Sequence, residues 1–327
     1  MKKFLLLLSV LFVVSCSSDT EELAPVIIAN TSLIYPEELL EIPSQEIIDL
    51  MNFAYNKMEN STSKILAVSW KVGAFISEGG FDRPFNTHAV TLSQETIESI
   101  IEQTGTWIDA AFVAEGLPSD YPIEEIKNEQ LISLRNYLEG GADASTQLNL
   151  SPNIRILYLA KPTNMNHSSD YLTFVLHETY HALQKDIAIE SCLISRETNS
   201  KSNFSWIIEG AAEYFAQKIY QELNSSYNGS NRFMADAFYS YQEDNREALI
   251  NSGSIASRGA AALSLMIQKG FLQESLILDG SLFHNCTTET DYLDANSHIL
   301  NVKENWFKIS SDNGNYSFTT EALDGSI

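Results

Sequence analysis

Two histidines and a glutamate near the middle of the chain have the spacing of a metal site. His177-Glu178-Thr179-Tyr180-His181 is an H-E-x-x-H run. A helix turns about 100° per residue, so His177 and His181 would lie on one helix face, one turn apart. Two such imidazoles can bind a tetrahedral Zn²⁺, and Glu178 could reach a water on the metal as a general base. The alternative is an amphipathic helix that carries two unrelated histidines.

The residues around this run predict the helix that would carry it. Ser168, Ser169 or Asp170 can cap its beginning. An apolar stripe then faces the core, and it consists of Leu172, Val175, Leu176, Thr179 and Leu183. The two histidines lie beside this stripe, at the border between the core and a cleft.

A catalytic zinc needs a third protein ligand, and Glu209 is the candidate, 28 positions after His181. Glu209 lies within Trp206-Ile207-Ile208-Glu209-Gly210-Ala211-Ala212, which predicts a largely buried stretch of helix. A buried carboxylate needs a partner, and a metal would serve. The alternative is an ordinary solvated carboxylate on a helix surface.

Together, the run from His177 to His181 and the later Trp206-x-x-Glu209-Gly210-x-Ala212-x-Tyr214 resemble the gluzincin clan of metallopeptidases. The second segment is most similar to aminopeptidase N and the peptidase MA-like families. The resemblance implies that His177, His181 and Glu209 are zinc ligands and that Glu178 is the general base. It also implies that Glu213 holds the spare N–H of a ligating histidine.

The chain departs from this clan in two places. The two pieces are separated by an apparent insertion, Lys185 to Ser205. A tyrosine that precedes a Gly-Ala pair in related families is replaced by Ala256 here. We therefore consider Tyr239, Tyr241 and Arg258, in the same downstream region, as candidate donors to the oxyanion.

The first residues predict export and a lipid anchor. Residues 1–15 have a basic start and an apolar run from Phe4 to Val14 that is too short to span a bilayer. Val13-Val14-Ser15-Cys16 resembles a bacterial lipobox, which implies cleavage before Cys16, lipid on its sulfur and a place in the cell envelope, at the outer membrane or cell surface. The alternative is an ordinary secretory signal with an incidental cysteine. Residues 16–43 would be a flexible tether.

Composition narrows the classes of function. The 327 residues are 44% hydrophobic and 10% aromatic, as expected of a globular protein. The net charge is −23, which makes nucleic acid an unsuitable partner. With Cys16 lipidated, Cys192 and Cys286 could form a disulfide in an oxidising compartment or remain two buried thiols.

The gluzincin resemblance, together with the helical and strand-like segments along the chain, implies an α+β fold, mostly helical, with a small sheet beside the zinc helix. Residues 44–327 would form one zincin-like catalytic unit, with an α/β part to about 165 and the zinc helices and a helical part over 166–327. Asn153 to Ala160 predicts a strand. By resemblance it could be an edge strand that pairs with extended substrate, or equally an internal strand without that role.

These observations predict a lipid-anchored zinc peptidase that acts on a peptide or protein substrate. Zinc would polarise the scissile carbonyl, and Glu178 would pass the proton of water to the leaving amine. One alternative is an inactive envelope protein that keeps the fold as a binding scaffold. Another is hydrolysis of a non-peptide amide.

Overall fold

The computed structural model describes residues 29–36, 41–58, 62–77, 86–141, 145–151, 153–163, 165, 167–184, 202–243, 255–283 and 297–324. These form a mostly helical α+β fold, which confirms the predicted fold class. The signal segment, Cys16, Cys192, Cys286 and residues 185–201 lie outside the described residues. None of the described helices is long and apolar enough to cross a membrane.

The larger sheet is mixed and has the order β1-β2-β5-β4, with β3 paired to β2. Its strands are β1 (Thr31–Ile34), β2 (Lys64–Phe75), β3 (His88–Val90), β4 (Ser145–Ser151) and β5 (Ile154–Pro162). β2 runs parallel to β1 and β5, whereas β4 is antiparallel to β5. β5 is therefore internal, which is the second of the two alternatives that the sequence left open. β4, which the sequence did not predict, lies at that edge. β1 also corrects the predicted tether, because four of its residues pair with β2.

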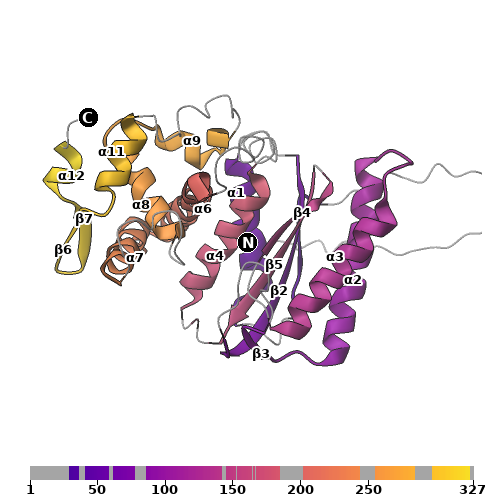
Figure 1. Ribbon diagram of the computed structural model, residues 1–327. Coiled ribbons are helices and arrows are strands. Elements are labelled where there is room, and N and C mark those ends of the chain that lie inside the picture. Colours follow the sequence, from indigo (N-terminus) through magenta and orange to yellow (C-terminus); the bar gives the residue numbers. More distant parts are fainter. Residues whose placement is uncertain are drawn as a thin grey trace, which may run out of the picture.

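Helices cover both faces of this sheet (Figure 1). On one face lie α1 (Ser44–Lys57) and α4 (Ser168–Leu183), and on the other lie α2 (Gln94–Glu115) and α3 (Ile123–Gly140). Alternate strand residues point to opposite faces, so Ala67 and Leu157 join the core under α1 and α4, while Val68 and Tyr158 join the core under α2 and α3. The sheet thus provides a rigid support for one side of α4.

A second group of helices packs on the side of α4 away from the sheet (Figure 1). It contains α6 (Ser202–Leu223), α7 (Gly229–Glu243), α8 (Ile255–Gln268), α9 (Glu274–Leu278), the short 3₁₀ helix η3 (Ser281–Phe283), α11 (Ser297–Asn305) and α12 (Thr320–Asp324). A hairpin of β6 (Ile309–Asp312) and β7 (Asn315–Phe318) joins this group. The helix predicted around Glu209 corresponds to α6, whereas the sequence did not predict the hairpin.

α6 and α8 approach each other closely at two glycines. A Cβ added to Gly259 of α8 would lie 2.8 Å from the Cα of Gly210 of α6 and closer still to the carbonyl oxygen of Trp206. Only residues without a side chain allow this backbone contact. The crossing fixes the position of α6 along its axis and its rotation about that axis, at the turn that carries Glu209.

The predicted cap of α4 is wrong. α4 begins after His167, and none of Ser168, Ser169 and Asp170 caps it. At α2, Ser93 is the cap, and its Oγ accepts from the backbone N–H of Thr96. The difference at α4 does not alter the face of that helix that carries the histidines.

Candidate metal centre

His177 and His181 lie one turn apart on α4, as the spacing predicted. Their ring centroids are 4.7 Å apart, and their Nε2 atoms are separated by 3.0 Å. The side chains are 12% and 14% exposed, so both rings lie at the edge of the core and are largely shielded from solvent. The apolar stripe beside them is buried as expected, including Leu172, Val175 and Leu176.

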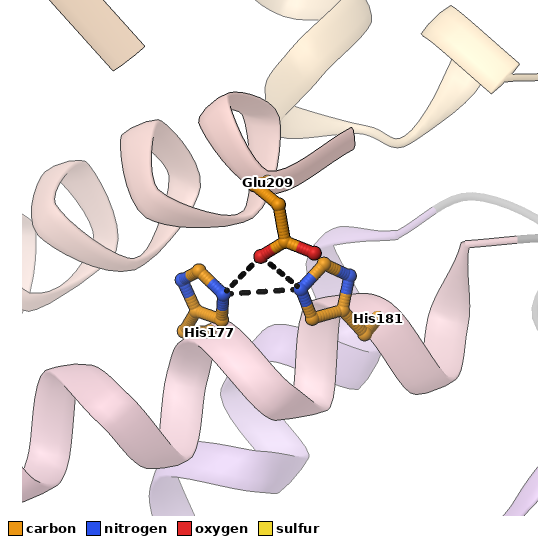
Figure 2. A group of neighbouring side chains, drawn as sticks. All are labelled: His177, His181 and Glu209. Carbon is orange, nitrogen blue, oxygen red and sulfur yellow. Dashed lines mark hydrogen bonds and ion pairs between the residues drawn. The ribbon is translucent and has the colours of Figure 1, made fainter. Parts of the chain in front are cut away.

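Glu209 reaches down from α6 to meet both rings (Figure 2). Its Oε2 lies 3.3 Å from Nε2 of His177 and 3.3 Å from Nε2 of His181. Zinc–ligand bonds of about 2.0–2.1 Å in a tetrahedron place neighbouring ligand atoms about 3.3 Å apart. The three atoms therefore fit one zinc ion, and two imidazoles with one carboxylate are a donor set that zinc accepts.

The surroundings of Glu209 correct one detail of the sequence argument. Trp206, Ile207, Ala211 and Ala212 are buried, as predicted, but the side chain of Glu209 is 37% exposed. The carboxylate thus projects from a buried stretch of helix toward a more open region. Among the described residues, three potential ligands converge here, which leaves one tetrahedral position for water or substrate.

The other ring nitrogen of each histidine contacts a polar side chain. Nδ1 of His177 lies 3.3 Å from Oε2 of Glu213, the residue that the resemblance implied. Nδ1 of His181 lies 2.9 Å from Oε1 of Gln184. Because both acceptors favour a proton on Nδ1, both Nε2 lone pairs are directed to the common centre.

The charges around the histidines shift their protonation. Burial opposes a charge on His177, but the hydrogen-bonded carboxylates of Glu209 and Glu213 outweigh it and raise the pKa of His177 to about 10. The pKa of His181 is raised against the effect of burial by Glu209. Burial disfavours a charged Glu209, yet the two histidines hold the pKa of Glu209 well below its usual range. Without a metal, these shifts favour an ionised Glu209 beside two imidazoles whose pKa values are raised.

Glu178 lies next to this centre and takes no part in its triangle of ligand atoms. Its Oε2 accepts a hydrogen bond of 2.7 Å from Oγ1 of Thr146 on β4. A carboxylate fixed in this way beside a metal can take a proton from an attacking water. Glu178 and His177 also form part of the wall of a cavity of about 480 Å³, bounded by α4, α6 and α7.

The three candidate oxyanion donors have other contacts. The hydroxyl of Tyr239 lies 2.7 Å from that of Tyr316, the ring of Tyr241 stacks on Phe307, and the buried Arg258 donates to Ser240. None of the three candidates lines the cavity beside His177 and Glu178. These partners account for the three side chains structurally, and their catalytic role stays a prediction.

Sequence reasoning missed Thr146 and Gln184. Gln184 is three residues after His181, a spacing at which helical side chains meet, so the sequence contained a signal for it. Thr146 is 32 positions from Glu178 on an unpredicted strand, and no local pattern connects them. Comparisons with protein-family models, with curated proteins and with solved structures found no match to this chain.

Proposed function

We propose that this chain is a zinc-dependent peptidase in which His177, His181 and Glu209 hold the metal and Glu178 is the general base. The observation that carries the proposal is the convergence of three ligand atoms within 3.0–3.3 Å of one another, beside a separately anchored glutamate. A merely structural zinc site is usually closed by four protein ligands and has no use for an adjacent base.

Zinc, when bound, supplies a Lewis acid that polarises the carbonyl and lowers the pKa of water to about 7. The chain's own residues perform the proton transfers. Glu178 accepts the proton of the attacking water and delivers it to the nitrogen of the leaving amine as the C–N bond breaks. Thr146 keeps the Glu178 carboxylate in place, while Glu213 and Gln184 keep the two imidazoles in the required tautomer.

The edge of the sheet offers a place for the substrate backbone. β4 is the outer strand on the side of β5, and its Thr146 touches Glu178. An extended peptide could add to the sheet there by main-chain hydrogen bonds, beside the base. This assigns to β4 the role that the sequence suggested for the strand at 153–160.

Two variants with isosteric changes separate the enzyme from a binding scaffold. Glu209→Gln exchanges an anionic ligand for a weak neutral one, so we expect less bound zinc. Glu178→Gln removes only the base, so we expect one zinc per chain, an intact fold and a rate lower by about 10²–10⁴. Elemental analysis and digestion of a diverse peptide library measure both effects.

Other outcomes would favour other functions. Equal cleavage by wild type and Glu178→Gln would remove Glu178 as the base. A wild-type protein that holds zinc but cleaves no peptide would favour the scaffold, or a hydrolase of non-peptide amides if such substrates are consumed. Unchanged zinc in His181→Ala would contradict the metal site itself.

We also propose attachment to the bacterial envelope through lipid on Cys16, which the lipobox-like Val13-Val14-Ser15-Cys16 motivates. The mature protein should then fractionate with membranes. A Cys16→Ser protein that is still processed and still sediments with membranes would contradict this proposal.

A further inference from the structure

The cavity beside the candidate base has two kinds of wall. Met165 and Phe174 contribute apolar surface near the beginning of α4. The same wall carries acidic side chains from three helices, namely Asp170 of α4, Glu213 of α6 and Asp236 of α7. A pocket lined by both apolar and acidic side chains suits a long amphipathic side chain rather than a purely apolar one.

The charge of the cavity is predominantly negative. Its wall carries the four carboxylates of Asp170, Glu178, Glu213 and Asp236 and one guanidinium, that of Arg232. Arg232 lies 3.2 Å from Asp236 and 3.9 Å from Asp170, so it is shared between two acids. Zinc at His177 would add its own positive charge beside Glu213, whereas Asp170 and Asp236 share one guanidinium between them.

Burial is the main influence on Asp236. It raises the pKa of Asp236, while Arg232 lowers that pKa by more than Glu213 raises it. The charged form of Asp236 therefore depends on a nearby cation. An additional positive charge in this cavity would be stabilised by Asp170 and Asp236 together.

We propose that this cavity receives the side chain of a lysine or arginine of the substrate, at a position next to the scissile bond. The methylene stem would pack on Met165 and Phe174, and the cationic end would meet Asp170 and Asp236. The inference rests on the proposed function, because Glu178 belongs both to the cavity wall and to the catalytic centre. It adds a substrate class, namely peptides with a basic residue beside the cleaved bond.

The test compares peptides that differ at one residue only, which is lysine, norleucine or glutamate. With the zinc-loaded full chain, we expect kcat/KM to be at least about tenfold higher for lysine than for norleucine, the size of one charge-assisted hydrogen bond. Equal values for lysine and norleucine, or a preference for glutamate, would overturn the proposal while leaving the peptidase intact.

Two substitutions in the cavity wall should affect the preference for lysine in different ways. Asp236→Asn removes one acid and releases Arg232, so the preference for lysine should fall about tenfold and glutamate should be accepted better. Arg232→Gln removes the competing cation, so the preference for lysine should be kept or increased. Asp170→Asn replaces Asp236→Asn if the latter does not fold by circular dichroism. A lysine preference that is unchanged by loss of either acid would overturn the assignment to this cavity.

A binding measurement separates failure of this inference from failure of the peptidase. Fluorescently labelled versions of the three peptides are titrated into zinc-loaded Glu178→Gln and followed by anisotropy. If the lysine peptide binds most tightly but the wild-type protein cleaves no peptide, the proposed lysine pocket is supported and the proposed peptidase activity is rejected. Equal binding of all three peptides would reject the cavity whether or not cleavage is seen.

Discussion

Thr146 on β4 donates a hydrogen bond of 2.7 Å to Glu178 on α4, so the edge of the sheet holds the candidate base. The same hydroxyl lies 3.4 Å from the carbonyl oxygen of Glu178. The contact joins two elements that are far apart in the chain. It orients the carboxylate beside the candidate metal centre.

Removal of the Thr146 hydroxyl should slow catalysis without loss of metal. Thr146→Val keeps the shape of the side chain, so we expect full zinc occupancy, a similar KM and a kcat lower by about tenfold, because the base is less well oriented. Thr146→Ser restores the hydroxyl and should recover most of the rate. Steady-state kinetics with zinc analysis of both variants measures this, and an unchanged kcat in Thr146→Val would show that the contact is only structural.

Gln184 should control zinc affinity. Its Oε1 holds Nδ1 of His181, and its Nε2 donates 3.3 Å to the carbonyl oxygen of Ile208, next to Glu209. Gln184→Ala loses both contacts and should weaken zinc binding about 10–100-fold, the range found for residues that orient metal ligands. Gln184→Glu keeps an acceptor for His181 and should lose less.

A chelator competition titration measures these affinities. Gln103→Ala, on the exposed side of α2, is the matched control and should leave the affinity unchanged. Wild-type affinity in Gln184→Ala would contradict the role of Gln184.

The crossing of α6 and α8 should tolerate no added methyl group. Gly259→Ala forces the two backbones apart, so we expect a loss of about 1–3 kcal/mol of stability and weaker zinc binding, because Glu209 moves with α6. Gly105→Ala on α2 is the control: its added methyl would meet only side-chain atoms at 3.4 Å or more, so it should be neutral or stabilising. Thermal melts and zinc titrations of both variants measure the two effects. Equal stability and equal zinc affinity in Gly259→Ala and Gly105→Ala would contradict this expectation.

Zinc binding should release protons at neutral pH. Burial opposes a charge on His177, but Glu209 and Glu213 raise its pKa to about 10, so the metal-free protein carries a proton there that zinc must displace. The pKa of Glu209 is held low, so Glu209 adds no proton. Calorimetric titrations at pH 7.5 in two buffers of different ionisation enthalpy should give about one proton or more per zinc. Zero release would contradict a protonated His177.

The same pKa predicts how the metal-free protein responds to alkali. The pKa of His177 is higher in the folded state than the usual value near 6.5, so the folded state binds the proton more tightly. This contribution to stability is fully present below about pH 6.5 and is lost as the pH rises through about 10. Urea unfolding of the zinc-free protein at pH 6 and pH 10 would test the direction of this effect. A higher free energy of unfolding at pH 10 than at pH 6 would contradict it.

The sequence by itself determined the features that depend on local periodicity. The spacing of His177 and His181 places both rings on one helix face wherever that helix packs, because 3.6 residues make a turn. The apolar neighbours of Glu209 likewise indicated α6, and the stretch from Asn153 to Ala160 indicated β5. Each pattern involves residues only a few positions apart, so it can be recognised in the sequence without knowledge of the fold.

Only the tertiary structure decided which distant side chains meet. Glu209 is 28 positions from His181, and its place above the two rings depends on the crossing of α6 and α8 at Gly210 and Gly259. Thr146 reaches Glu178 because β4, and not β5, occupies the edge of the sheet beside α4. Such contacts arise from the packing of whole elements, whose relative positions are set by many buried residues at once, and so no local spacing encodes them.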